Sequence, residues 1–229
     1  MKKVKIKGHN FNLTVNKKNI SSIRLKLINK KHIEINTPIF TPSFFINSFI
    51  ANHADWIIAQ SKKIKNKSLK SLKNIKILDQ DYKIIYNKTS TASVIIDKNE
   101  QTIDINTPSF SNTYLRQLID KKFRPFALSL IKENLKKLAQ KYNFSYNSVT
   151  VRNQSSRFGS CSSRGNLNFN WQIIFFPYPI FCHLLLHELT HLDIKNHQKE
   201  FWQQLSIYDP NYQKNNKFLK QNYKQYLLF

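Results

Sequence analysis

The segment HLLLHELTHLDIKNHQKEFW (183–202) guides the interpretation of the whole sequence, because it holds four of the seven histidines of the 229-residue chain. If residues 180–194 form a helix, His187 and His191 lie one turn apart on the same face, about 6 Å along the axis. Two imidazoles in this arrangement can bind one metal ion through bonds of about 2.0–2.1 Å. The segment therefore predicts a metal site on a largely apolar helix.

The residue between the two histidine turns predicts a reaction. Glu188 points about 100° away from the histidine row, so it can reach a water on the open side of the ion. This is the HExxH arrangement, in which the glutamate serves as general base. A catalytic zinc ion needs a third protein ligand, and His183 is two turns from His191, about 12 Å along the axis. We therefore expect His197 as the third ligand, reached after the helix ends, and His183 in packing or in support of the site.

The first part of the chain is rich in short runs that alternate between apolar and polar residues, which predicts strands. Two of these runs, HIEINTP (32–38) and TIDINTP (102–108), match closely, and each precedes a predicted helix. They indicate a duplicated strand–strand–helix unit. The alternative is a chance match, since Ile, Asn and Thr are common in this chain. The first of the two helices is expected from Ser43 to about Lys65.

Further along, a long amphipathic helix is expected over about 112–142, and Pro125 should kink it or split it in two. VTVRNQ (149–154) and RFGSCSSRGNLNFNW (157–171) then predict a short sheet beside the histidine segment.

Two of the three glycines in the chain, Gly159 and Gly165, fall in this predicted sheet region. Where glycine is so scarce, they suggest backbone geometry that a Cβ would obstruct. The patterns together predict an α+β fold. Its β-rich region with one helix covers residues 1–110, and its histidine-bearing region covers residues 111–229.

RFGSCSSRGNLNFNW followed by HLLLHELTHLDIKNHQKEFW resembles the YgjP-like metallopeptidase family, relatives of the SprT-like zincins. The matching features are the R-F-G-S-C-S loop, the G-N-L strand, and H-E-L-x-H followed by N-H and F-W. The resemblance implies a zincin-like core of the minigluzincin type, with a small sheet and an HExxH helix. It also implies one zinc ion with Glu188 as catalytic base and as ligands His187, His191 and His197. Phe158 stands where the family more often has tryptophan, and His183 where it has an aliphatic residue.

The residues and the resemblance agree on a zinc-dependent peptidase that cleaves peptide bonds with a metal-activated water. Candidates for stabilising the oxyanion are Arg157, Tyr208 and Tyr212. The strand GNLNFNW (165–171) could pair with an extended substrate, or it could be an ordinary sheet strand over the histidine helix. Further candidates for substrate binding come from the loop and strand before the helix: Arg157, Gly159, Ser160, Asn166 and Asn170.

The net charge of +24 leaves other functions open. Codon usage in an AT-rich genome explains abundant lysine, but a basic surface also binds nucleic acid. The alternatives are a metal-dependent endoribonuclease, a class that uses three histidines at these spacings without the glutamate, and a nucleic-acid-associated zinc protein. A protein or peptide substrate is the expected partner. We expect a cytoplasmic protein without a membrane partner, because the sequence shows neither a signal-peptide pattern nor a membrane-length apolar run, and its two cysteines form no CxxC pair.

Overall fold

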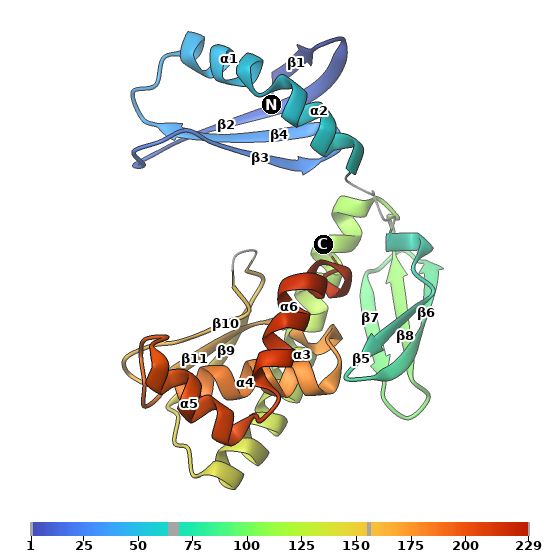
Figure 1. Cartoon of the computed structure of the whole chain (residues 1–229). Helices are drawn as coiled ribbons and strands as arrows, with labels where there is room; N and C mark the ends of the chain where they lie inside the picture. The colour runs from blue at the N-terminus through green and yellow to red at the C-terminus, as the bar shows by residue number, and fades with distance from the viewer. Residues whose placement is uncertain (1, 64–68, 155–156, 229) are drawn as a thin grey trace. The chain divides into compact units, whose positions relative to one another are not determined.

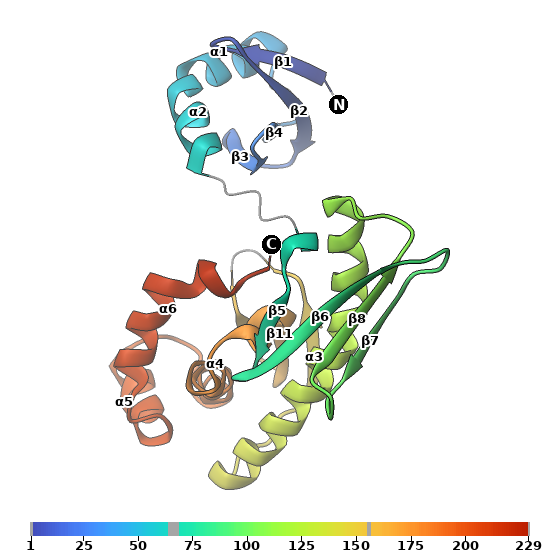
Figure 2. The same cartoon turned by 90° about the vertical axis from the view of Figure 1, so that its right-hand side faces the viewer.

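The computed structural model describes residues 2–63, 69–154 and 157–228. The chain divides into two compact units, Met1–Lys67 and Ser68–Phe229, which are described separately below (Figures 1 and 2). This division does not coincide with the boundary expected near residue 110. The strands before residue 110 belong to the second unit because their apolar side chains share a core with its long helix.

The first unit is a four-stranded sheet with two helices over one of its faces (Figure 1). The strands occur in the order β1-β2-β4-β3, with β2 parallel to β4 and the other neighbours antiparallel. Their apolar residues alternate, so one face of the sheet is buried against the helices. The elements are β1 (Lys2–Ile6), β2 (His9–Lys18), β3 (Arg24–Asn29), β4 (His32–Pro38), α1 (Ser43–Asn52) and α2 (Ala54–Lys63).

The single helix predicted from Ser43 is two helices in the structure, so this prediction was wrong. The break lies at His53, which caps α1 with φ −103° and ψ 11°. Its Nδ1 atom lies 2.8 Å from the carbonyl oxygen of Phe49, so the side chain bonds to the last turn of α1. The predicted end near Lys65 lies outside the described residues.

The second unit begins with a sheet of the same topology as the first. Its order is β5-β6-β8-β7, with β6 parallel to β8 and the other neighbours antiparallel. The matching runs 32–38 and 102–108 contain β4 and β8, which occupy equivalent places in the two sheets. The elements are the 3-10 turn η1 (Leu69–Ser71), β5 (Asn74–Ile77), β6 (Gln80–Lys88), β7 (Ser93–Asp97) and β8 (Thr102–Thr107).

The long helix α3 (Asn112–Tyr142) runs through Pro125 without ending there, so the split considered from the sequence does not occur. Proline removes one backbone hydrogen bond, but the fully buried side chains of Ala127, Ile131 and Leu135 hold the following turns in the core. The hydroxyl of Ser111 accepts a hydrogen bond from the first turn, and Asn143 ends the helix in the left-handed conformation, with φ 57°.

A three-stranded sheet and three helices complete the second unit. The sheet order is β10-β11-β9, so β11 is the central strand. Of the two alternatives for this strand, it is an ordinary sheet strand and does not pair with a substrate, because both of its edges are already occupied. The elements are β9 (Ser148–Arg152), β10 (Gly159–Cys161), β11 (Asn166–Asn170), the 3-10 turn η2 (Trp171–Phe175), α4 (Tyr178–Thr190), α5 (Lys199–Tyr208) and α6 (Tyr212–Tyr226).

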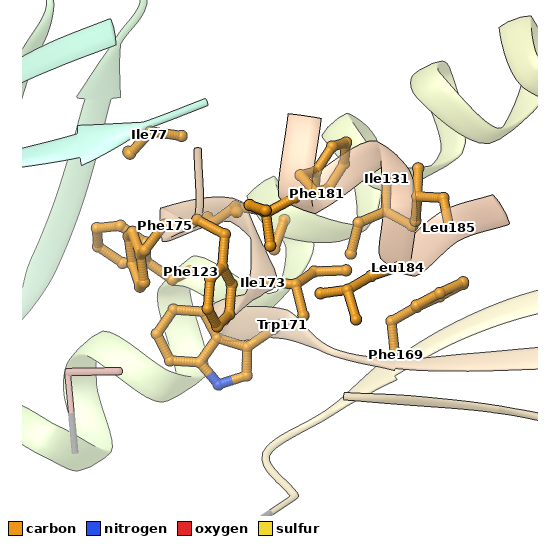
Figure 3. Packing of buried hydrophobic residues seen from close by; sticks show 14 of the residues in the cluster. Ile77, Phe123, Ile131, Phe169, Trp171, Ile173, Phe175, Phe181, Leu184 and Leu185 are labelled. Atoms are coloured by element: carbon orange, nitrogen blue, oxygen red, sulfur yellow. The ribbon is translucent and has the colours of Figure 1, made fainter. Parts of the chain in front are cut away.

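Helix α4 is held by an apolar core that it shares with α3, β11 and η2 (Figure 3). Phe181 and Leu185 of α4 are fully buried there, together with Phe169, Trp171 and Ile173. Each such side chain contributes about 1.5–3 kcal/mol of burial energy. This anchoring fixes the rotation of α4 about its axis, and so fixes where its histidines point. No helix of the described residues is long and apolar enough to cross a membrane.

Candidate metal centre

Three histidines meet where α4 ends. The helix stops at Thr190, earlier than predicted, and the backbone turns tightly through Leu192, whose N–H bonds to the carbonyl of Leu189. This turn returns His197 to the helix before α5 begins. The Nε2 atom of His197 lies 3.0 Å from that of His187 and 3.1 Å from that of His191.

These distances are short enough for hydrogen bonds and also come close to the spacing of metal ligands. A tetrahedral ion with bonds of about 2.05 Å holds its ligand nitrogens about 3.3 Å apart. The Nδ1 atom of His191 donates to the carbonyl of Ile194 at 2.8 Å, so in the neutral ring the Nε2 atom carries a lone pair. A single proton on Nε2 of His197 can satisfy only one of its two close contacts. At least two nitrogen lone pairs therefore face the same point, as metal ligands do.

The surroundings of His187 and His191 favour the neutral imidazole, which is the form that binds metal. Burial lowers the pKa of His187 to about 3, and the neighbouring histidines add to the effect. Burial also lowers the pKa of His191. Phe201, which is fully buried, contributes to this apolar environment, because its ring centroid lies 4.5–4.9 Å from those of all three histidines.

Glu188 is buried beside the histidines, and its Oε2 atom has no hydrogen-bond partner within the described residues. Burial raises the pKa of this carboxyl to about 8, against the opposing effect of the Arg157 guanidinium. The backbone of β10 packs directly on the carboxylate: a Cβ at Gly159 would lie 2.6 Å from Oε1 of Glu188. Gly159 therefore makes the close approach expected of it, and Gly165 adopts a φ of +72° that favours glycine.

The histidines and Glu188 line a cavity of about 800 Å³. Of the residues predicted to bind substrate, Arg157, Gly159, Ser160 and Asn170 line this cavity, whereas Asn166 does not. The side-chain oxygen of Asn166 instead accepts a hydrogen bond of 2.7 Å from the hydroxyl of Ser148 on β9.

Asn170 stabilises the backbone at the cavity wall through two hydrogen bonds. Its side-chain oxygen accepts from the backbone N–H of Gln172 at 3.0 Å and so caps η2. Its amide nitrogen donates to the carbonyl of Gln154 at 2.6 Å. Both ends of the buried amide are thus used to shape the loop before β10.

Of the three candidates for stabilising an oxyanion, only Arg157 lines the cavity. Tyr208 contacts the side chain of Gln204, and its carbonyl accepts from Tyr142 at 3.0 Å. Tyr212 stacks on Trp202 with ring centroids 5.8 Å apart. Both tyrosines therefore support α5 and α6.

His183 lies on the same wall but has other partners. It is 1% exposed, its Nδ1 atom donates to Oδ2 of Asp209 at 2.6 Å, and its Nε2 atom lies 3.2 Å from Oδ1 of Asn216. Burial raises the pKa of Asp209, but hydrogen bonds from His183 and Asn215 outweigh it, and the pKa is lowered. Sequence reasoning missed Asp209 and Asn216 because 26 and 33 residues separate them from His183.

A buried helix with two histidines one turn apart, a third histidine after a turn and an adjacent carboxylate is the arrangement of a metallopeptidase of the HExxH class. A family model described as YgjP-like, metallopeptidase domain, matches residues 21–222, so the chain belongs to this family. The resemblance seen in the loop and helix motifs is thereby confirmed, as is the α+β fold class.

Two solved structures are similar to part of the chain. The crystal structure of the metallopeptidase zymogen of Methanocaldococcus jannaschii jannalysin is 23% identical, and that of Pyrococcus abyssi abylysin is 15% identical. Each match covers 40% of this chain and 94% of the other, with a TM-score of 0.35. No curated protein compared with the chain matches it.

Proposed function

We propose that this chain is a peptidase that uses one zinc ion held by His187, His191 and His197, with Glu188 as general base. The observation that supports it most is the convergence of three Nε2 atoms beside a buried carboxylate oxygen that has no partner within the described residues. Neutral imidazoles suit zinc, which takes nitrogen ligands in tetrahedral sites. When bound, zinc supplies a Lewis acid that lowers the pKa of water and polarises a carbonyl group.

Glu188 has the position and the environment of a general base. Its free Oε2 atom can accept a proton from a water in the cavity while the water oxygen attacks the peptide carbon. The carboxyl then gives this proton to the leaving amine nitrogen, so no net proton is gained by the enzyme. Burial, which raises the pKa of this carboxyl to about 8, supports its role as a group that can hold a proton, and a nearby cation would lower that pKa again. The endoribonuclease class considered above lacks this glutamate, so an endoribonuclease activity would give Glu188 no role.

The open edge of β10 is where an extended peptide would bind. The carbonyl of Phe158 and the N–H of Ser162 both bond to the β11 side. Because neighbouring residues of a strand point their backbone groups to opposite edges, Gly159 and Cys161 present theirs to the open edge. Both residues line the cavity. A substrate strand added at this edge would run past Glu188 by β-augmentation.

The substitution Glu188→Gln tests the proposal, because it keeps the shape of the side chain and removes its basicity. We expect the variant to bind zinc as the wild type does and to lose at least about 100-fold in the rate of casein or peptide hydrolysis. Zinc is measured by metal analysis of the same samples. Glu200→Gln, the same change at an exposed position of α5, is the matched control and should retain full activity. Undiminished hydrolysis by the Glu188 variant would exclude the general-base role.

A further inference from the structure

The positive charge is concentrated in the first unit. Residues 1–67 contain 14 Lys and Arg against 2 Asp and Glu, a net charge of +12. Residues 68–229 contain 23 against 11, also +12. Half of the net charge therefore lies in less than a third of the chain. This uneven division needs an explanation beyond a uniform bias in composition.

The two sheets of identical topology provide an internal comparison. Their strand order and pairing directions agree, so each position in one sheet has a counterpart in the other. Glu34 corresponds to Asp104, for example, and Asn36 to Asn106. Codon usage acts on both sheets alike. A difference in charge between counterpart positions therefore reflects what each surface does.

In the first sheet, the two edge strands carry four exposed cations on the face opposite α1 and α2, here called the basic face: Lys3, Lys5, Arg24 and Lys26. Arg24 is opposite Asn36 and Lys26 is opposite Glu34, the single acidic residue of this face. Glu34 is half-buried and accepts a hydrogen bond from the amide of Asn36. Within the described part of the chain, none of the four cations forms an ion pair.

In the second sheet, the register places other residues at the four counterpart positions: Asn74, Lys76, Ser93 and Ile95. The one remaining cation, Lys76, pairs with Asp81 at 3.7 Å. The same face also carries one further cation, Lys83, and three acidic residues, Asp81, Asp97 and Asp104, so its charges are balanced. Abundant lysine in the chain is thus not enough to produce a basic face on this topology.

The spacing and chemistry of the basic face suit a polyphosphate chain. Its cations lie on β1 and β3, the two edge strands, about 14 Å apart if adjacent strands are about 4.8 Å apart. Between them lies a row of side chains that donate and accept hydrogen bonds: Asn10, Asn12, Thr14, Asn16 and Asn36. Phosphates bind cationic side chains, and amides and hydroxyls contact phosphate, sugar and base groups. This row of polar side chains would oppose insertion of the face into the apolar interior of a bilayer.

We propose that the basic face of the first unit binds nucleic acid, with phosphates on its cations and the polar row against the strand between them. This surface is separate in sequence from the zinc ligands and Glu188, and its function goes beyond the proposed peptidase activity. It binds whether or not the metal site is loaded. The peptidase would thereby be held on nucleic acid while its cavity acts on protein.

Anisotropy titrations of the full chain with a labelled single-stranded RNA and a duplex DNA, each of about 20 nucleotides per strand, test the proposal across about 50–400 mM salt. The face variant combines Lys3→Asn, Arg24→Ser and Lys26→Gln, the first two being the counterpart residues of the second sheet. The control variant combines Lys121→Asn, Lys122→Ser and Lys136→Gln, three exposed positions of α3. Each variant lowers the net charge of +24 by three, so overall charge is matched.

We expect the face variant to reduce the slope of log affinity against log salt by about 2 for single strands, since each lost phosphate contact removes about 0.7. Its affinity at low salt should fall at least about tenfold, while the control stays within about twofold of wild type. Peptide hydrolysis and thermal melting by circular dichroism should be unchanged in the face variant. Equal weakening of the two variants, or a wild-type slope near zero, would overturn the proposal. Binding of anionic vesicles or polyglutamate, but not nucleic acid, through the basic face would also overturn it.

Discussion

The contact between Gly159 and Glu188 allows a quantitative test of how the base is positioned. In Gly159→Ala the new Cβ would lie 2.6 Å from Oε1, 2.7 Å from Cγ and 2.8 Å from Cδ of Glu188. Carbon atoms settle at about 3.5 Å from their neighbours, so strand and side chain must separate by about 0.9 Å. A displacement of about 1 Å in a catalytic group costs about 100-fold in rate. Such overpacking also destabilises a fold by about 1–3 kcal/mol.

The assay for Gly159→Ala combines steady-state peptide hydrolysis, zinc analysis and thermal melting. We expect kcat to fall about 100-fold with zinc content unchanged, because the clash lies on Glu188 and not on the ligands. Ser129→Ala, at an exposed position of α3 outside the cavity lining, is the control and should stay close to wild type. The reasoning is refuted if Gly159→Ala retains wild-type kcat, or if it loses zinc as completely as a ligand variant.

Two further predictions concern Asp209, which bonds to His183 of the cavity wall, and Cys161, which lines the cavity. Because the pKa of Asp209 is lowered in the fold, its stabilising effect is present above the ordinary value of 3.8 and is lost as the pH falls through the lowered value. Asp209→Asn should therefore lower the free energy of unfolding by about 2 kcal/mol at neutral pH and by less near pH 3. Denaturant unfolding at both pH values measures this difference. An equal loss of unfolding free energy at the two pH values would contradict the prediction. Cys161→Pro removes an N–H from the open edge of β10 and should raise KM for an extended peptide without loss of zinc. Cys161→Ala keeps the N–H and should leave KM unchanged. Equal KM values for the two variants would exclude pairing at this edge.

The parts of the site that could be predicted from the sequence are those set by local spacing. The helical repeat places His187 and His191 on one face, and distance along the axis excludes His183 from the same ion. The turn that returns His197 could be inferred only as a requirement of the third ligand. In the structure, this turn begins at Thr190, four residues earlier than the predicted end of the helix.

The features that sequence reasoning missed depend on contacts between distant segments. Nothing in the spacing of His183 points to Asp209, because the two meet only when α4 packs against the turn before α6. The central place of β11 depends on a parallel pairing with β9, which an alternating pattern does not reveal. The helix break at His53 depends on a local side-chain bond to Phe49. Alternating patterns did locate β4 and β8, one in each four-stranded sheet, because each sheet has one buried face.

The central claim is that three imidazoles from α4 and the turn after it hold one zinc ion. The most direct measurement is the zinc content, after dialysis, of purified wild type, His197→Ala and His183→Ala. The account predicts about one zinc per chain in the wild type and in His183→Ala, and almost none in His197→Ala, because a structure with two remaining histidines lacks the third ligand of such sites. Full zinc content in His197→Ala, or a greater loss in His183→Ala, would contradict it.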